Sequence, residues 1–202
     1  MLGKLITFEG GDGVGKSTQI QLLAQYCKAK GIEYIITREP GGGKISEEIR
    51  KILLNKDDDA CINDCEALLI AAARVQHVHD IILPSLQANK MVLCDRYVHS
   101  TFAYQGYGRG IDLAFLKAIN MPAMEKVMPA VTFLLSMHPR DAFARKNKAF
   151  VFDRIEQAGS AFHERVYNGY LKLAEDDDKI ITIDATLPIS SIHASIVARL
   201  KI

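Results

Sequence analysis

A glycine-rich segment from Gly10 to Thr18 carries a lysine and a serine at the spacing used to bind phosphate groups. It fits the pattern G-x-x-x-x-G-K-[ST] and directly follows an apolar run from Leu2 to Phe8. Small residues let successive backbone N–H groups curl around a phosphate, and a helix that begins here points its positive end at the anion. Lys16 supplies a charge to the β- and γ-phosphate oxygens, and the Ser17 hydroxyl can ligate Mg²⁺. We therefore predict a nucleoside triphosphate site formed by Gly10, Gly11, Asp12, Gly13, Val14, Gly15, Lys16, Ser17 and Thr18.

An acidic residue and an arginine follow another apolar run. Asp95 comes directly after Met91-Val92-Leu93-Cys94, and Arg96 is the next residue. An acid at the end of a buried strand is where phosphate-loop proteins hold Mg²⁺ or its water shell, although an aspartate can also cap the following helix. The guanidinium of Arg96 is a planar, permanently charged fork that suits a phosphate. Ser17 and Asp95 are therefore the predicted Mg²⁺ ligands.

Three more arginines, Arg38, Arg50 and Arg74, lie on segments that we expect at the same rim. Several arginines on ligand-binding segments indicate a second phosphate site. Phosphoryl transfer between two nucleotides needs such a site, because the acceptor phosphate must be held in line with the donor γ-phosphate against charge repulsion. Positioning and charge stabilisation carry most of this chemistry, so no acid–base triad is required. The alternative is a nucleotide-binding switch that hydrolyses slowly and lacks the second site.

Strand and helix patterns alternate along the chain. Apolar runs predict strands at residues 2–8, 32–37, 90–94, 131–136 and 179–184. Helical patterns lie at residues 16–30, 46–54, 63–88 and 188–200, and Asn63 and Asp112 are expected helix caps. This order predicts an α/β protein with the three-layer P-loop NTPase fold, in which a five-stranded parallel sheet has helices on both faces. No linker divides residues 1–202, so we expect one domain, with ligands at the carboxyl ends of the strands.

The composition argues against several classes of protein. The 202 residues include 25 basic and 24 acidic side chains, which give a net charge of +1. The chain therefore lacks the excess of positive charge expected of a protein that binds a nucleic acid polymer. There is no secretory signal and no apolar run long enough to span a bilayer, so we expect a cytoplasmic protein with no membrane partner. The cysteines form no C-x-x-C pair and are expected to be reduced thiols in the core: Cys27, Cys61, Cys65 and Cys94.

Two charged segments each leave two interpretations open. Residues 145–154 are basic, with Phe143, Phe150 and Phe152 close in sequence. They predict either a lid at about residues 143–154, which closes over the donor phosphates and excludes water, or a solvated helix face. Asp57-Asp58-Asp59 could hold a metal ion, but three consecutive acids in a loop usually face water.

Several further motifs lie along nearly the whole chain. They are Phe8-Glu9-Gly10, Thr37-Arg38-Glu39-Pro40-Gly41-Gly42, Ala73-Arg74-Val75-Gln76-His77, Cys94-Asp95-Arg96-Tyr97, Ala103-Tyr104-Gln105-Gly106 and Asp153-Arg154-Ile155-Glu156. Many NTPases share the phosphate loop, whereas the combination of all these motifs is highly specific. Taken together, the motifs resemble those of the bacterial thymidylate kinases.

The resemblance implies ATP as the phosphoryl donor, dTMP as the acceptor, Mg²⁺ as the cofactor, and a homodimer. It further implies that Asp12 contacts the sugar 3′-hydroxyl and that Arg50 and Arg96 hold the acceptor phosphate. Tyr104 would lie near C2′ and disfavour a ribose hydroxyl. Arg74, Thr101 and Gln105 would meet the thymine edge. The residues implied around dTMP are Glu39, Arg50, Ile70, Arg74, Arg96, Thr101, Tyr104 and Gln105, and those implied in catalysis are Lys16, Asp12, Arg96 and Arg154.

A few positions distinguish this chain within the family that it resembles. Gly13 stands where some members carry a basic residue, so the chain resembles the type whose arginine lies in the lid. The usual first lid arginine is missing, which leaves Arg154, Arg145 or Lys148 to carry that charge. Ile70 replaces an aromatic residue that stacks on thymine, so apolar packing takes the place of stacking, and broader pyrimidine specificity is an alternative.

Overall fold

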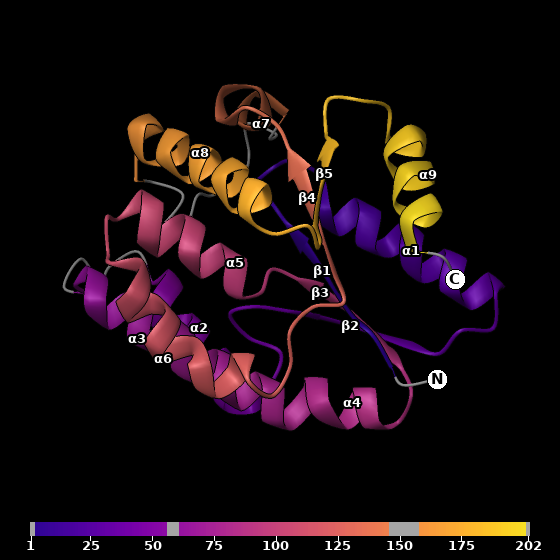
Figure 1. Ribbon diagram of the computed structural model, residues 1–202, viewed down its shortest axis with the longest axis horizontal. Helices are drawn as coiled ribbons and strands as arrows, with labels where there is room; N and C mark the ends of the chain where they lie inside the picture. The colour runs from indigo at the N-terminus through magenta and orange to yellow at the C-terminus, as the bar shows by residue number, and fades with distance from the viewer. Residues whose placement is uncertain (1–2, 56–60, 146–157, 201–202) are drawn as a thin grey trace.

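Five parallel strands form the centre of the molecule (Figure 1). The computed structural model describes residues 3–55, 61–145 and 158–200. The strand order is β2-β3-β1-β4-β5, and every neighbouring pair is parallel. The predicted α/β fold, with helices on both faces of the sheet, is confirmed. The strands are β1 (Leu5–Glu9), β2 (Tyr34–Arg38), β3 (Met91–Asp95), β4 (Val131–Ser136) and β5 (Ile180–Asp184).

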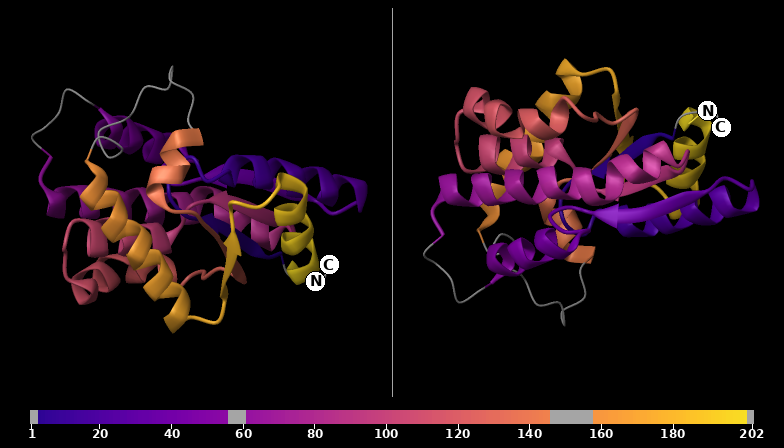
Figure 2. Two further views of the ribbon diagram at one scale, coloured as in Figure 1. Left: turned by 90° about the horizontal axis from the view of Figure 1, so that it is seen from above. Right: turned by 90° about the horizontal axis from the view of Figure 1, so that it is seen from below.

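Helices cover the two faces of this sheet unequally, as the two views in Figure 2 show. The helices α1 (Lys16–Ala29) and α9 (Ile189–Leu200) lie together on one face. On the other face, α3 (Asn63–His77) continues through the π-helix η1 (Val78–Ile82) into α4 (Leu83–Gln87). The remaining described helices are α2 (Lys44–Leu54), α5 (Val98–Thr101), the π-helix η2 (Phe102–Gly108), α6 (Leu113–Met124), α7 (Pro139–Arg145) and α8 (Ser160–Asp176).

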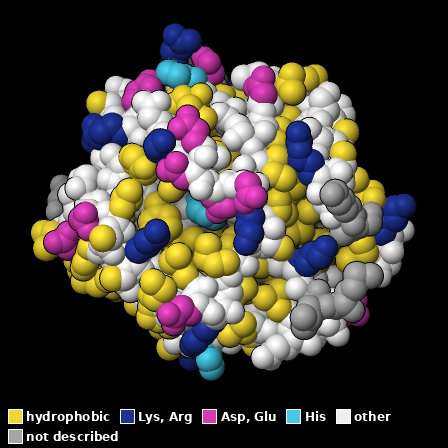
Figure 3. All heavy atoms as spheres, viewed as in Figure 1, with side chains coloured by type: hydrophobic (Ala, Val, Ile, Leu, Met, Phe, Trp, Pro, Cys, Tyr) yellow, Lys and Arg dark blue, Asp and Glu magenta, His cyan; other side chains and the backbone are white. Residues whose placement is uncertain are grey.

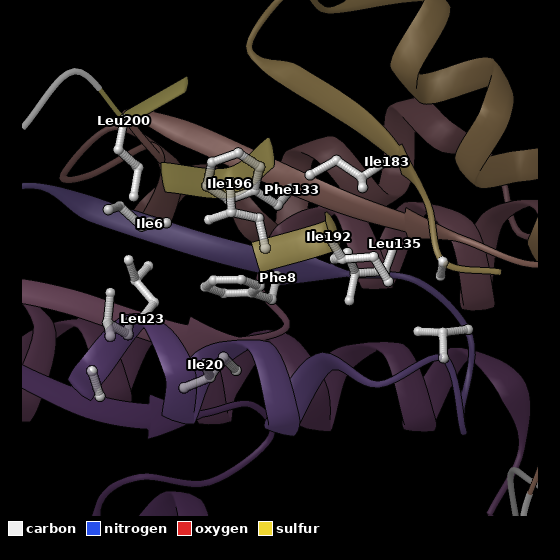
Figure 4. Packing of buried hydrophobic residues seen from close by; sticks show 14 of the residues in the cluster. Ile6, Phe8, Ile20, Leu23, Phe133, Leu135, Ile183, Ile192, Ile196 and Leu200 are labelled. Atoms are coloured by element: carbon white, nitrogen blue, oxygen red, sulfur yellow. The ribbon is translucent and has the colours of Figure 1, made fainter. Parts of the chain in front are cut away.

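A continuous apolar core holds α1 and α9 against the sheet (Figure 4). Ile6 and Phe8 of β1 point into this core, whereas Leu5 points into the core on the opposite face. Every residue of β1 is buried because helices cover both faces, which explains why the strand reads as a near-continuous apolar run. Ile20 and Leu23 carry the buried face of α1.

The strand register brings the carboxyl ends of β1, β2 and β3 to one edge. Asp95 pairs with Phe8 on one side and with Arg38 on the other. The chain then turns at Gly10, whose φ is 127°, and a Cβ there would lie 2.4 Å from the Leu135 carbonyl oxygen. Only glycine fits this close approach, so β1 can lead directly into the phosphate loop.

Some local expectations are confirmed and others are wrong. Asp112 caps α6, because its side chain accepts a hydrogen bond from the Phe115 N–H at 2.9 Å. Asn63 does not cap α3, because Ile62 holds the cap position and its side chain makes no cap hydrogen bond. Cys65 is exposed and Cys61 is partly exposed, so neither is a core thiol, since the first turn of α3 directs Cys65 toward solvent.

In Figure 3, the lysines and arginines of the described residues are scattered among acidic and hydrophobic side chains on the face shown. No helix within the described residues has both the length and the apolar character needed to cross a membrane. The acidic run Asp57–Asp59 and the lid residues 146–154 lie outside the described residues.

Candidate active site

A cavity of about 620 Å³ opens at the carboxyl edge of the sheet. It joins segments that are far apart in the sequence: the phosphate loop, the loop after β2, α2, α3, and the stretch from the end of β3 through η2. Its lining includes most of the residues predicted from the sequence, namely Asp12, Gly13, Gly15, Lys16, Ser17, Thr18, Glu39, Arg50, Ile70, Arg74, Asp95, Arg96, Thr101, Tyr104 and Gln105. Val14 instead packs its side chain into the core beside α1, so only its backbone can face a ligand.

The lysine of the phosphate loop is folded over the loop itself. Lys16 Nζ donates to the carbonyl oxygens of Gly10 at 3.2 Å and Gly11 at 2.8 Å. Burial lowers the pKa of this ammonium, and the nearby Arg96 cation lowers it further. The first turn of α1 contains no acidic residue of its own, and the helix directs its positive end toward the cavity. This end of the cavity therefore offers an ammonium and a helix N-terminus to an anion.

Two oxygen ligands suited to Mg²⁺ lie beside the lysine. Ser17 Oγ donates to Asp95 Oδ2 at 3.2 Å, and both residues line the cavity. Mg²⁺ prefers oxygen ligands and is usually held by one or two protein groups, with phosphates and water completing the shell, so this pair fits the ion. The capping alternative for Asp95 is wrong, because Tyr97 holds the cap position of α5, and the Tyr97 N–H donates to Glu9 Oε1 at 2.8 Å rather than to Asp95.

Arg96 is held between Asp12 and Tyr104. Its Nη2 donates to Asp12 Oδ1 at 2.5 Å, and the Tyr104 hydroxyl donates to Asp12 Oδ2 at 3.0 Å. Burial raises the pKa of Tyr104 well above its ordinary value, so the hydroxyl remains a donor. The backbone of Arg96 has a φ of 70°, which is rare for a residue other than glycine, and its Nη1 reaches the Gly10 carbonyl oxygen at 2.9 Å. The guanidinium is thus fixed next to the phosphate loop.

The buried carboxylate of Glu9, for which the sequence predicted no role, supports Arg96 through two hydroxyl groups. Glu9 Oε2 accepts hydrogen bonds from Ser100 Oγ at 2.5 Å and from the Tyr170 hydroxyl at 2.9 Å. Arg96 Nη1 donates to the same Tyr170 oxygen at 3.2 Å. Ser100 also lines the cavity, whereas Tyr170 reaches the network from α8. Glu9, Ser100 and Tyr170 are therefore positioning residues behind Arg96.

Arg74 is a buried part of the cavity wall, only 2% exposed, and its guanidinium is held by several side chains. Its guanidinium donates to Glu39 Oε2 at 2.7 Å, to Thr101 Oγ1 at 2.9 Å and to Asn120 Oδ1 at 2.5 Å. His77 Nδ1 lies 2.9 Å from the other oxygen of Glu39. Because Glu39 already balances the charge of Arg74, this arginine is better suited to a neutral base than to a phosphate.

Replacing Arg74 by methionine should destabilise the fold by about 3 kcal/mol, because removing one partner leaves the buried Glu39 carboxylate without its cation. Urea unfolding followed by circular dichroism measures this loss. Arg199→Met on the exposed side of α9 is the matched control and should change stability by less than about 0.5 kcal/mol. Equal stability of the two variants would show that the Arg74–Glu39 pair is not a structural requirement.

The remaining arginines differ in their surroundings. Arg50 lines the cavity and donates Nη1 to the Pro40 carbonyl oxygen at 2.7 Å. Arg38 also lines the cavity, but its half-exposed side chain pairs with Glu47 at 2.9 Å. Arg50 and Arg96 are therefore the arginines of this wall that are best placed to meet an acceptor phosphate.

Of the predicted lid at about residues 143–154, the structure describes only residues 143–145. Arg145 ends α7 and donates to the carbonyl oxygens of Ala185 at 2.8 Å and Thr186 at 3.4 Å. It does not belong to the described lining of the cavity. Lys148 and Arg154, the other residues considered for the lid charge, lie outside the described residues.

The fold and the cavity together define a class of protein. A phosphate loop with its lysine and a candidate Mg²⁺ pair lies at one side of the cavity, and arginines with a separate polar wall lie at the other. This is the arrangement of a P-loop nucleoside monophosphate kinase, which holds two nucleotides with their phosphates facing each other.

Comparisons with known proteins identify the family. The family model for thymidylate kinase matches residues 8–196, and the chain belongs to the thymidylate kinase family. It is 44% identical over 209 residues to the thymidylate kinase of Geotalea uraniireducens, covering 98% of this chain and 96% of the relative. It is 42% identical over 201 residues to that of a Geobacillus species, covering 98% and 96%. A crystal structure of thymidylate kinase from Ehrlichia chaffeensis superposes with a TM-score of 0.78 at 31% identity, covering 100% of both chains.

Proposed function

We propose that this chain transfers the γ-phosphoryl group of ATP to dTMP, forming ADP and dTDP. Family membership supports the reaction, and it favours dTMP over the broader pyrimidine specificity that Ile70 left open. The observation that carries the assignment of the site is the single cavity that Lys16 and Ser17 share with Arg50 and Arg96.

In the reaction, the bond between the γ-phosphorus and the β,γ-bridging oxygen breaks, and a bond forms to a phosphate oxygen of dTMP. Negative charge is spread over the transferred group and the leaving oxygen. Lys16 exchanges the carbonyl oxygens of Gly10 and Gly11 for the β- and γ-phosphate oxygens. Arg50 and Arg96 hold the acceptor phosphate in line with the γ-phosphate and offset the repulsion between the two.

Mg²⁺ would be held by Ser17 and Asp95, and it would supply positive charge to the β- and γ-phosphate oxygens. The fit of their hydroxyl and carboxylate oxygens supports this assignment. Arg154, on the lid, is the proposed further cation for the transferred group, and closure of that segment would exclude water from the reaction.

The acceptor nucleoside would lie along the wall between Asp12 and Gln105. Asp12 would accept a hydrogen bond from the sugar 3′-hydroxyl, and the ring of Tyr104 would leave no room for a 2′-hydroxyl. Ile70 would provide an apolar contact for the thymine ring, while Arg74, Thr101 and Gln105 meet its polar edge. The cavity positions of all these residues support this arrangement.

A coupled assay of ADP formation with a panel of monophosphates tests the function. We expect Mg²⁺-dependent turnover with dTMP that exceeds turnover with AMP, CMP and GMP by a large factor in kcat/KM. Comparable turnover with all four acceptors would overturn the assignment of dTMP as the substrate.

We also propose that residues 1–202 act as one catalytic domain in the cytoplasm and form a homodimer. Exposed apolar side chains on the neighbouring helices α2, α3 and α6 support self-association: Ile45, Ile52, Leu68, Phe115 and Met121. Sedimentation equilibrium would then give twice the mass of one chain. A mass equal to one chain at micromolar concentration would contradict the dimer.

A further inference from the structure

A buried carboxylate beside the cavity has no role in the reaction described above. Glu66 lies in the first turn of α3 and is 0% exposed. A buried carboxylate is unfavourable unless donors satisfy it, so its partners indicate what it does. Gln105 Nε2 donates to Glu66 Oε1 at 2.9 Å, and Arg109 Nη2 lies 3.3 Å from Oε2.

Glu66 determines which way the amide of Gln105 points. An ionised carboxylate accepts hydrogen bonds and cannot donate them, and Arg109 is a permanent cation that pairs with this ionised form. The amide nitrogen of Gln105 must therefore face Glu66, and the amide oxygen must point elsewhere. An amide without such a partner could adopt either orientation with little difference in shape.

The oxygen of Gln105 is open to the cavity. Within residues 3–55, 61–145 and 158–200, no group donates a hydrogen bond to Gln105 Oε1. In that part of the chain, the side-chain polar atoms that are fully buried and lack a hydrogen-bond partner are Gln19 Oε1 and His193 Nδ1. Gln105 Oε1 is not one of them, so it is not fully buried. Because Gln105 lines the cavity, its Oε1 is a hydrogen-bond acceptor available to a ligand there.

We infer that Glu66 is a positioning residue for base selection, which orients Gln105 so that an acceptor faces N3 of the acceptor base. The inference rests on the proposed function, in which Gln105 meets the base edge. Thymine and uracil carry a hydrogen on N3, whereas cytosine carries a lone pair there. An acceptor at this place favours dTMP and dUMP and disfavours dCMP, and a reversed amide would do the opposite.

Contacts with α8 hold Arg109, the cation that pairs with Glu66, in place. Arg109 follows η2, and its guanidinium carbon lies 4.7 Å from the centre of the Phe162 ring on α8. Arg165, also on α8, donates to the Gly108 carbonyl oxygen at 2.8 Å. The end of η2 is therefore fixed from α8, so the cation that pairs with Glu66 has a defined position.

Glu66→Gln tests the inference with nearly unchanged shape. The new amide can accept from Arg109 with its oxygen and donate to Gln105 Oε1 with its nitrogen, so the Gln105 amide turns over and presents its nitrogen to the cavity. We expect the ratio of kcat/KM for dTMP to that for dCMP to fall by about tenfold or more. The ratio for dTMP to dUMP should stay constant, because these two bases share the N3 hydrogen.

Two further variants separate base selection from a structural role. The double variant Glu66→Gln with Gln105→Glu again places an acceptor toward the cavity, so it should restore the dTMP-to-dCMP ratio to near the wild-type value. Asp64→Asn, on the exposed side of the same helical turn, is the matched control and should leave the ratio unchanged. Thermal unfolding of each variant shows whether it is folded.

Each outcome decides the inference. An equal loss with dTMP, dUMP and dCMP in Glu66→Gln, or a double variant that keeps the lowered ratio, would overturn the role of Glu66 in base selection. These results would leave the proposed function intact. A wild-type protein without preference for dTMP over dCMP would instead contradict the proposed function itself.

Discussion

Lys16→Ala should lower kcat for transfer from ATP to dTMP by about 10³-fold. The ammonium is the buried cation of the phosphate loop, and it lies at the start of α1 where the β- and γ-phosphates are expected. Alanine removes the charge that stabilises the leaving and transferred groups, and no other lysine of the described residues lines the cavity. Steady-state kinetics with saturating ATP and dTMP measures the loss.

Lys28→Ala, at the exposed end of the same helix, is the control for the loss of one lysine from α1. It should retain wild-type kcat and KM. If Lys16→Ala kept a kcat close to that of Lys28→Ala, the role assigned to the phosphate loop would be wrong.

Arg96→Ala should reduce kcat/KM for dTMP by about 10²-fold, with a smaller change in KM for ATP. The guanidinium lies between the phosphate loop and the acceptor side of the cavity, and five neighbouring groups hold it there. Alanine removes the phosphate contact and also the ion pair between Arg96 and Asp12, so the side chain expected to bind the sugar should be less well positioned. Initial rates over a grid of ATP and dTMP concentrations separate the two Michaelis constants.

The control for this variant is Arg140→Ala on α7, whose side chain is largely exposed and outside the cavity lining. It should have wild-type kinetics with both substrates. Unchanged KM and kcat for dTMP in Arg96→Ala would contradict the assignment of the acceptor phosphate site.

The sheet could be predicted because its central strands β1, β3 and β4 are buried on both faces. Such strands read as short apolar runs, and β4 was predicted with the bounds that it has in the structure. The helix α8 was missed, although Phe162, Val166, Tyr170 and Leu173 recur at helical spacing and three of them are buried. That periodicity was a usable signal. The segment α5–η2 shows no such helical periodicity in its sequence. Its polar and aromatic residues pack against other elements, and these contacts favour the helical conformation.

The site was predictable where a local motif carries the chemistry. The phosphate loop places Lys16 and Ser17 by itself, and strand ends place Asp95 and Arg96. The partners of the supporting carboxylates could not be predicted from one sequence, because they lie on distant segments. Glu9 accepts a hydrogen bond from Tyr170, which lies 161 positions away in the sequence, and Glu39 accepts one from Arg74, which lies 35 positions away. Such pairings depend on the packed fold rather than on local spacing.

The central claim is that one cavity holds two nucleotides end to end, and titration calorimetry with a bisubstrate ligand tests it most directly. The ligand joins the 5′ positions of adenosine and thymidine through a chain of phosphates long enough to span both sites. We predict one ligand bound per chain, with an affinity well above that of ATP or dTMP alone, because joining two ligands avoids part of the cost of binding each separately. Binding no tighter than that of the better single nucleotide would contradict the account.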